Sequence, residues 1–393
     1  MSSIHKVLSH IEEGKVADLT RELVRIPSEN PPGNESEVAE FIRGRMEDLG
    51  LEVHFYECSE GRPNVIGKLK GEGNKSLMFN AHTDTVPVGD REFWSEDPFG
   101  GAIKDGKLYG RGATDMKGGL AAMLIAIESL IESGVKLKGD VMLAVVVDEE
   151  HGKLGTKSIV ERGYRADAAV IGEPTELKVC IAHKGALRLE VATIGKAAHS
   201  SEPSKGVNAI YKMAKICLAM ELLMERLNER GHVLVGNASV SVGTITGGVK
   251  VNMVPDRCVI SVDRRLIPGE RADNARMEIE EILKNLQSGD PEFKYTVRTM
   301  QEYNPSEISE EEEIVKSCRL AVEAVEGVDP GVSGFPAGCD MYLLVNEANI
   351  PTVILGPGSL AQAHQPDEFV EVKQVVDAAK IYSLIALMFL GYE

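Results

Sequence analysis

Residues 76–84 read SLMFNAHTD, an apolar run followed at once by a histidine and an aspartate. The run at Ser76–Ala81 predicts a buried strand, and side chains two positions apart at its end point the same way. We predict that His82 is a metal ligand, because neutral imidazole binds zinc or cobalt well, and that the Asp84 carboxylate accepts its second N–H. Taken alone, the pair also fits a strand-end histidine capped by a neighbouring aspartate.

A glycine-rich segment further along the chain presents another carboxylate. Residues 110–119 read GRGATDMKGG, which places Asp115 just before a long apolar helix predicted at Gly118–Ser133. The spacing fits neither of the glycine-rich phosphate-binding motifs, so we expect the glycines to let the backbone wrap closely around an ion. The alternative is an ordinary helix-capping aspartate.

Three adjacent acids follow a predicted buried strand at Val141–Val147. Asp148, Glu149 and Glu150 would lie at the carboxyl edge of an α/β sheet, where such sheets bind their ligands. Adjacent carboxylates repel one another and need a cation, a raised pKa or solvent. Solvent remains the alternative, but with a cation present Glu150 can bind metal while Glu149 takes a proton from water.

Two further segments extend the pattern. Glu173 follows a predicted strand at Ala168–Ile171, and His364 lies in the long loop after a predicted strand at Thr352–Leu355. The candidate metal ligands are therefore two imidazoles and three carboxylates: His82, Asp115, Glu150, Glu173 and His364. This set suits two divalent ions about 3.5–4 Å apart that share one bridging carboxylate. Without cysteine, it fits Zn, Co or Mn in a hydrolase better than a structural zinc.

The motifs resemble those of a known family, the M20 metallopeptidases and deacylases. This family includes acetylornithine deacetylase, succinyl-diaminopimelate desuccinylase, aminoacylase-1 and glutamate carboxypeptidase. The likeness covers nearly the whole chain, and the motifs occur in the family's order: AHTDTVP at 81–87, GRG through DMKGG at 110–119, DEE at 148–150, GEPT at 172–175 and the late His364.

The resemblance implies roles for the residues of the predicted site. It implies two ligand sets, one of His82, Asp115 and Glu173 and the other of His364, Asp115 and Glu150. It also implies that Asp84 orients His82 and that Glu149 is the general base.

Three residues of an inserted segment gain a role mainly from the resemblance. His199, in GKAAHSS at 195–201, is similar to a histidine that reaches the partner subunit's active site and stabilises the oxyanion. Asn252 and Arg264 lie in segments similar to those that contact substrate. From the residues alone, His199 could instead be a surface or turn histidine. Asn252 could be a turn amide, and Arg264 could be a solvated charge at the end of a strand.

The order of predicted elements separates two domains. Residues 1–183 and 300–393 alternate helices and strands, which indicates an α/β domain with a sheet covered on both faces. Residues 184–299 follow a βαββαβ order, which indicates a ferredoxin-like domain inserted into the first. The resemblance implies a zinc-exopeptidase-like three-layer α/β/α catalytic domain and a lid or dimerisation domain. A free edge strand in the inserted domain would pair with a second copy, giving a homodimer.

Composition narrows the partners and the compartment. The chain has 393 residues, 43% of them apolar, and 43 Lys plus Arg against 61 Asp plus Glu, a net charge of −18. This charge disfavours nucleic acid and anionic membranes as partners, and no apolar stretch approaches the roughly 20 residues that span a bilayer. The six cysteines form no C-x-x-C pair, and the charged first thirty residues do not resemble a leader segment, so we expect a cytoplasmic protein.

The expected function is that of a two-metal amidohydrolase, which cleaves the amide bond of an N-acyl amino acid by metal-activated water. The segment GFPAGCD at 334–340 lacks the Gly-Thr-Ser run expected of a succinyl-diaminopimelate enzyme, so the acyl group stays open. One rival is a dipeptidase or carboxypeptidase that uses the same site on a peptide. A rival of another class is a catalytically silent dimeric binding protein, which the presence of Glu149 beside all five candidate ligands disfavours.

Overall fold

The computed structural model describes residues 3–393 and divides the chain into two compact units. The first unit takes the chain up to Ile181 together with Ile308–Gly334 and Cys339–Glu393, and the second takes Ala182–Glu307 and Phe335–Gly338. The division expected from sequence, at 183/184 and 299/300, differs mainly at its second boundary. The difference arises because the last strand of the inserted unit continues beyond Thr299.

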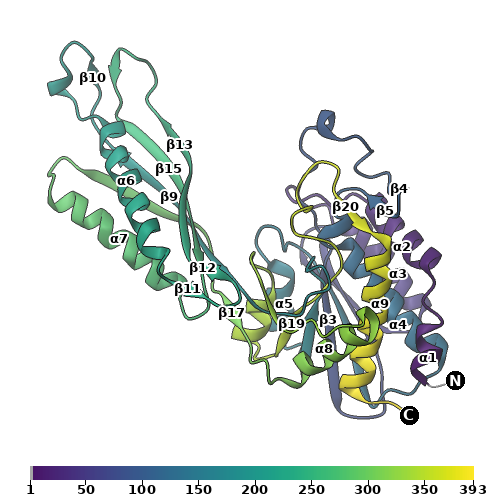
Figure 1. Cartoon of the computed structure of the whole chain (residues 1–393). Helices are drawn as coiled ribbons and strands as arrows, with labels where there is room; N and C mark the ends of the chain where they lie inside the picture. The colour runs from purple at the N-terminus through teal and green to yellow at the C-terminus, as the bar shows by residue number, and fades with distance from the viewer. Residues whose placement is uncertain (1–2) are drawn as a thin grey trace. The chain divides into compact units, whose positions relative to one another are not determined.

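The first unit is built on a mixed sheet, some of whose strands are labelled in Figure 1. The strands lie in the order β1 (Glu52–Ser59), β2 (Arg62–Leu69), β6 (Gly139–Val146), β3 (Lys75–His82), β7 (Ala168–Ile171), β19 (Thr352–Ile354) and β8 (Cys180–His183). β3 runs parallel to β6 and β7, and β7 runs parallel to β19. These four strands therefore end at the same edge of the sheet.

The helices of the first unit include the long segments of the sequence in which apolar residues recur with a helical period. They are α1 (Ser3–Leu8), α2 (Glu13–Arg25), α3 (Ser36–Asp48), α4 (Gly118–Ser133), α5 (Leu154–Glu161), α8 (Glu313–Glu326) and α9 (Val372–Leu390). A small sheet has the order β20 (Phe369–Glu371), β5 (Lys107–Tyr109) and β4 (Ala102–Lys104). These three-residue strands are too short to show a period in the sequence.

Adjacent residues of β3 show that helices cover both faces of the main sheet. Phe79 packs against Tyr382 of α9, with ring centroids 5.4 Å apart. The next residue, Asn80, points to the other face, where its amide donates to Thr156 Oγ1 of α5 at 3.3 Å. α4 contacts β3 and α9 and is largely apolar and buried, with two acidic residues near its carboxyl end. The predicted three-layer α/β/α architecture is confirmed.

The second unit is an antiparallel sheet with two helices. Its elements follow the order β9 (Gly185–Ile194), α6 (Ala209–Leu227), β13 (Ser239–Gly247), β15 (Arg257–Leu266), α7 (Ala272–Ser288) and β16 (Lys294–Tyr303). The strands lie in the order β13-β15-β9-β16, which is the ferredoxin-like arrangement expected from sequence. β16 passes its expected end at Thr299 because its register with β9 shifts between Thr299 and Gln301 and pairing then resumes.

Short strand pairs complete the second unit. They are β10 (Ala198–His199) with β14 (Met253–Val254), β11 (Gly231–His232) with β12 (Gly236–Asn237), and β17 (Ser306–Glu307) with the end of β8. No helix among residues 3–393 is both long enough and apolar enough to cross a bilayer.

Candidate metal centre and active site

The predicted site residues of the first unit follow the carboxyl ends of parallel strands. His82 is the last residue of β3, Glu149 and Glu150 come shortly after β6, and Glu173 comes two residues after β7. The segment that contains Glu173 packs closely against the segment that follows β19. A Cβ on Gly356 would lie 2.6 Å from the Glu173 carbonyl oxygen, so only glycine allows this approach.

His82 has a defined tautomer. Its Nδ1 lies 2.8 Å from the backbone carbonyl oxygen of Asp84, and a carbonyl can only accept a hydrogen bond. Nδ1 therefore carries the proton in the neutral ring, and Nε2 keeps the lone pair that a metal ion needs. This Nε2 faces two carboxylates, with Asp115 Oδ1 at 3.2 Å and Glu173 Oε1 at 3.8 Å.

Asp115 lies between the two candidate imidazoles. Its Oδ1 faces His82, while its Oδ2 lies 3.0 Å from His364 Nε2. The same His364 nitrogen lies 3.0 Å from Glu150 Oε1. The Asp115 carboxylate is therefore arranged as a bridge, with one oxygen towards each half of the site.

Donor atoms of the site are close enough to hold cations. The ligand atoms of His82, Glu149 and Glu173 lie within 4.8 Å of one another, as do those of His82, Asp115 and Glu150. The structure thus brings together all five ligands that the sequence predicts. It also places Glu149 beside them, at a distance that suits either a ligand or a base.

Burial and crowding give these acids unusual pKa values. Burial, followed by the charge of Asp115, raises the pKa of Glu150 to about 7 and that of Glu173 well above its usual range. Burial opposes ionisation of Asp115 too, but hydrogen bonds from His364 and His82 outweigh it and lower the pKa of Asp115. A crowded set of buried carboxylates with imidazoles is a donor set that fits divalent cations such as Zn.

Asp84 makes hydrogen bonds in the site beyond the single contact with His82 that the sequence predicts. Its carboxylate Oδ1 is 3.6 Å from His82 Nδ1, so the predicted carboxylate–imidazole hydrogen bond is replaced by the backbone carbonyl contact. The carboxylate instead accepts the backbone N–H groups of Glu149, at 3.0 Å, and Glu150, at 3.1 Å. Asp84 therefore fixes both the histidine and the acidic turn.

Two supporting groups were missed in the sequence. The amide of Asn30 donates to Asp84 Oδ2 at 2.8 Å and to Asp148 Oδ1 at 2.9 Å. Arg62 pairs with the same Asp148 oxygen at 2.9 Å. Asn30 lies in a proline-rich turn, and no spacing relates it to the strand ends, so the sequence carries no signal for this contact.

A buried ion pair joins the segment of Asp115 to the loop of His364. Glu368 pairs with Arg111, and its Oε1 accepts the backbone N–H of Asp115 at 3.1 Å. Arg111 also donates to the carbonyl oxygen of Gln365, at 3.3 Å. The arginine of the GRG motif was a possible signal, but its acidic partner lies 257 positions away.

In the second unit, His199 and Asn252 come together at an exposed pair of strands. His199 pairs with Met253, and the N–H of Ser200 donates to the carbonyl oxygen of Asn252 at 3.2 Å. The N–H of Ser201 donates to His199 Nδ1 at 3.2 Å, so a neutral His199 carries its proton on Nε2. Both predicted residues are exposed.

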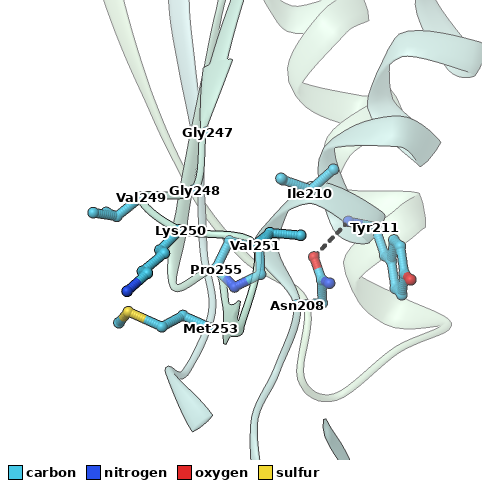
Figure 2. Close-up of a pocket in the computed structure, with 10 residues that line it drawn as sticks. All are labelled: Asn208, Ile210, Tyr211, Gly247, Gly248, Val249, Lys250, Val251, Met253 and Pro255. Atoms are coloured by element: carbon cyan, nitrogen blue, oxygen red, sulfur yellow. Dashed lines mark hydrogen bonds between the residues drawn. The ribbon is translucent and has the colours of Figure 1, made fainter. Parts of the chain in front are cut away.

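The loop that carries Asn252 borders a pocket of about 420 Å³ (Figure 2). In Figure 2, Val251 points towards Ile210, whereas Val249 points away from it. Val249 and Val251 are 90% and 98% exposed, which is unusual for apolar side chains in a loop.

The predicted substrate contact of Arg264 needs correction. The side chain is fully buried, and its Nη2 pairs with Glu270 at 2.5 Å. Alternation along β15 places Arg264 on the same face as the buried Ile260 and Val262. Arg264 therefore has no exposed atom for a substrate, and its ion pair is internal. The period of two in the sequence was the signal that could have shown this.

Taken together, the strand-edge site defines a class of protein. Two imidazoles and several buried carboxylates face one space at the carboxyl edge of an α/β sheet, an arrangement typical of metal-dependent hydrolases. A family model described as peptidase family M20/M25/M40 matches residues 78–388. The chain belongs to this family of metallopeptidases and amidohydrolases, as its motifs indicated.

Individual relatives differ in the substrate that their names give. An N-formyl-4-amino-5-aminomethyl-2-methylpyrimidine deformylase from Bacillus subtilis is 30% identical and covers 96% of this chain and 94% of its own. A probable succinyl-diaminopimelate desuccinylase from Staphylococcus epidermidis is 28% identical, with 94% and 96% covered. The structure of an M20 family metallo-carboxypeptidase from Sulfolobus solfataricus has a TM-score of 0.82 at 21% identity, with 95% and 99% covered. This last likeness shows the fold.

Proposed function

We propose that the protein is a two-metal amidohydrolase that removes an acyl group from the nitrogen of an amino acid or a related small amine. The observation that carries this proposal is the bridging position of Asp115, whose two oxygens lie 3.2 Å from His82 Nε2 and 3.0 Å from His364 Nε2. A different oxygen of Asp115 faces each imidazole, which is the arrangement expected of a carboxylate shared by two ions.

Further contacts support two proposed ligand sets, since Glu173 lies 3.8 Å from His82 Nε2 and Glu150 lies 3.0 Å from His364 Nε2. His82, Asp115 and Glu173 would hold one ion, and His364, Asp115 and Glu150 the other. Zinc fits this donor set, and cobalt or manganese could replace it. When bound, the two ions would lower the pKa of a water molecule towards about 7 and polarise the scissile carbonyl.

Glu149 is the proposed proton carrier. Its carboxylate lies beside the ligand atoms of His82 and Glu173 yet belongs to neither predicted ligand set. It would take a proton from the attacking water and later give it to the leaving nitrogen, releasing a carboxylate and an amine. Asp84 supports this role by accepting the N–H of Glu149.

His199 is the proposed oxyanion donor, acting on the site of a second subunit. Its Nδ1 accepts the N–H of Ser201, which leaves Nε2–H as the donor. Asn252, held next to the segment of His199, would contact the substrate.

We also propose a homodimer formed by the second unit. β13 is an edge strand, and Leu218 of α6 and Ile245 of β13 are 61% and 58% exposed.

The proposed substrate class rests on chemistry that the named relatives share. A deformylase and a desuccinylase both release an acyl group from a nitrogen, although the acyl groups differ in size. The carboxypeptidase likeness keeps peptides as the second candidate, because the same site can hydrolyse any accessible amide.

The charge of −18 gives no reason to add nucleic acid or an anionic membrane as a partner. All six cysteines are free, which supports a cytoplasmic location.

A substrate screen of the metal-loaded protein tests the proposal. Purified protein is stripped with a chelator, reloaded with Zn, Co or Mn, and assayed against N-formyl, N-acetyl and N-succinyl amines and amino acids and against dipeptides. We expect hydrolysis of at least one acylated amine or amino acid. Hydrolysis of dipeptides alone would favour the peptidase candidate, and metal binding without any hydrolysis would favour a silent binding protein.

A further inference from the structure

A buried lysine lies behind the proposed proton carrier. Lys153 is 5% exposed, and it follows Glu149 in the loop between β6 and α5. Its backbone N–H donates to the carbonyl oxygen of Asp148 at 2.5 Å, which closes this loop. Its φ of 55° places the backbone in the left-handed region, which is uncommon for a lysine. The loop therefore turns the lysine side chain back towards the strand edge.

The Lys153 ammonium holds Glu149 at two points. It forms an ion pair with the Glu149 carboxylate and donates to the Glu149 backbone carbonyl oxygen at 3.0 Å. Contacts to both ends of one residue restrict the rotation of its side chain. On its other side, the Glu149 carboxylate faces the ligand atoms of His82 and Glu173.

Asp340 lies on the far side of this lysine. Its Oδ1 is 4.0 Å from Lys153 Nζ, and its Oδ2 accepts a hydrogen bond from Thr156 Oγ1 at 2.6 Å. Both side chains are buried, with side-chain exposures of 6% for Lys153 and 2% for Asp340. Burying charges costs free energy unless they are paired in good geometry. The lysine is therefore fixed between two carboxylates, one of which is the proposed base.

We propose that Lys153 is a positioning residue for Glu149, aiming its carboxylate at the water that attacks the substrate, with Asp340 fixing the ammonium. This inference rests on the proposed function, because it takes Glu149 as the general base. A carboxylate on a flexible side chain must be held within a fraction of an ångström to act efficiently, and a displacement of about 1 Å can cost 10²-fold in rate. Lys153 supplies that constraint without touching the substrate.

The alternative is that Lys153 only balances buried negative charge. In that case its removal would destabilise the fold, but the turnover of the remaining folded protein would not change. A positioning role predicts a loss in kcat at an unchanged metal content and a nearly unchanged KM, because substrate and metal are held by other residues.

The experiment compares Lys153→Met with the matched variant Lys157→Met. Lys157 lies one helical turn further on in α5 and forms an exposed pair with Glu161. We expect Lys153→Met to lower kcat about 10- to 100-fold, with KM within about twofold of the parent and two ions still bound per chain. Lys157→Met should leave all three quantities unchanged. Normal kcat in folded, metal-loaded Lys153→Met would overturn the inference.

Rescue and a second variant keep the test decisive. Ethylammonium added to Lys153→Ala should restore part of the lost kcat, whereas tetramethylammonium, which has no N–H, should not. If Lys153→Met does not fold, Lys153→Arg keeps the charge but changes the donor geometry, and the same fall in kcat is expected. Normal kcat in that variant would contradict a positioning role.

Glu149→Gln separates this inference from the proposed function. Near-normal turnover of Glu149→Gln would refute Glu149 as the base and so remove the premise of this inference, whereas absence of hydrolysis by the metal-loaded parent protein would refute the proposed function. An inactive Glu149→Gln combined with a fully active Lys153→Met would refute only the role of the lysine.

Discussion

The strand-edge site and the exposed loops of the second unit differ in how completely this chain fixes them. At the strand edge, His82, Asp115 and Glu173 are buried. The tautomer of His82 and the acidic turn are set by hydrogen bonds within the chain. Around His199, by contrast, the side chains are exposed, and Val251 is 98% exposed. The difference indicates that hydrogen bonds within the chain preorganise the first region, whereas the role proposed for the second region depends on a partner subunit.

Removal of metal should have the largest effect, because the proposed ligands converge on one region. Chelation should abolish hydrolysis, and added zinc or cobalt should restore it, since both bind imidazole–carboxylate sites well. The measurement is activity against metal content during stepwise reloading. Fully active protein with fewer than one ion per chain would contradict a two-ion site.

Glu149→Ala should have the second-largest effect on activity. Loss of a general base should lower kcat by about 10²- to 10⁴-fold, while bound metal stays near its parental level. Glu150→Ala is the control from the neighbouring position, and it should lose metal together with activity. The assignment of roles would be reversed if Glu149→Ala lost the metal and Glu150→Ala kept it.

His199→Ala should lower kcat by about 10²- to 10³-fold and leave the metal content unchanged, because it removes one oxyanion donor. The loss should be repaired in trans. Mixed dimers of His199→Ala with Glu149→Ala contain one site with both residues intact, so activity should reappear after subunit exchange.

Exchange without recovered activity, or a fully active monomer, would return His199 to the role of a surface residue. Exchange itself can be followed independently, with two differently tagged chains.

Arg264→Met should have the smallest effect on catalysis. The substitution removes the buried ion pair with Glu270, which keeps a longer contact of 3.6 Å to Arg230, so the free energy of unfolding should fall by about 1–3 kcal/mol, measured by urea unfolding. KM should not change, because Arg264 has no exposed atom. A raised KM in a stably folded variant would revive the substrate contact that the sequence predicted.

The sequence predicts the architecture well where its patterns are long. The helix at Gly118–Ser133 is apolar over several turns, and the strand before His82 is mainly apolar, interrupted by Asn80, so both are found at the predicted places. Four of the five ligands are found together because each closes a strand of the parallel sheet or follows one, and parallel strands share an edge, whereas Asp115 comes from the segment directly before α4.

Other parts of the site could not be predicted, because they depend on contacts between distant segments or on an unusual backbone conformation. Asn30 reaches Asp148 across 118 positions, and Lys153 bends back onto Glu149 through a loop with an unusual backbone angle. The error at Arg264 has a different cause. The substrate contact predicted for Arg264 needs an exposed guanidinium, but alternation along β15 places the side chain on the buried face, where Glu270 pairs with it.

Anomalous diffraction from crystals of the zinc-loaded protein would show the number and positions of the bound ions. We predict two zinc peaks per chain, about 3.5–4 Å apart, with one oxygen of Asp115 towards each. His82 should lie next to one peak and His364 next to the other. A single peak, or two peaks that Asp115 does not bridge, would contradict the two-ion site on which the proposed function rests.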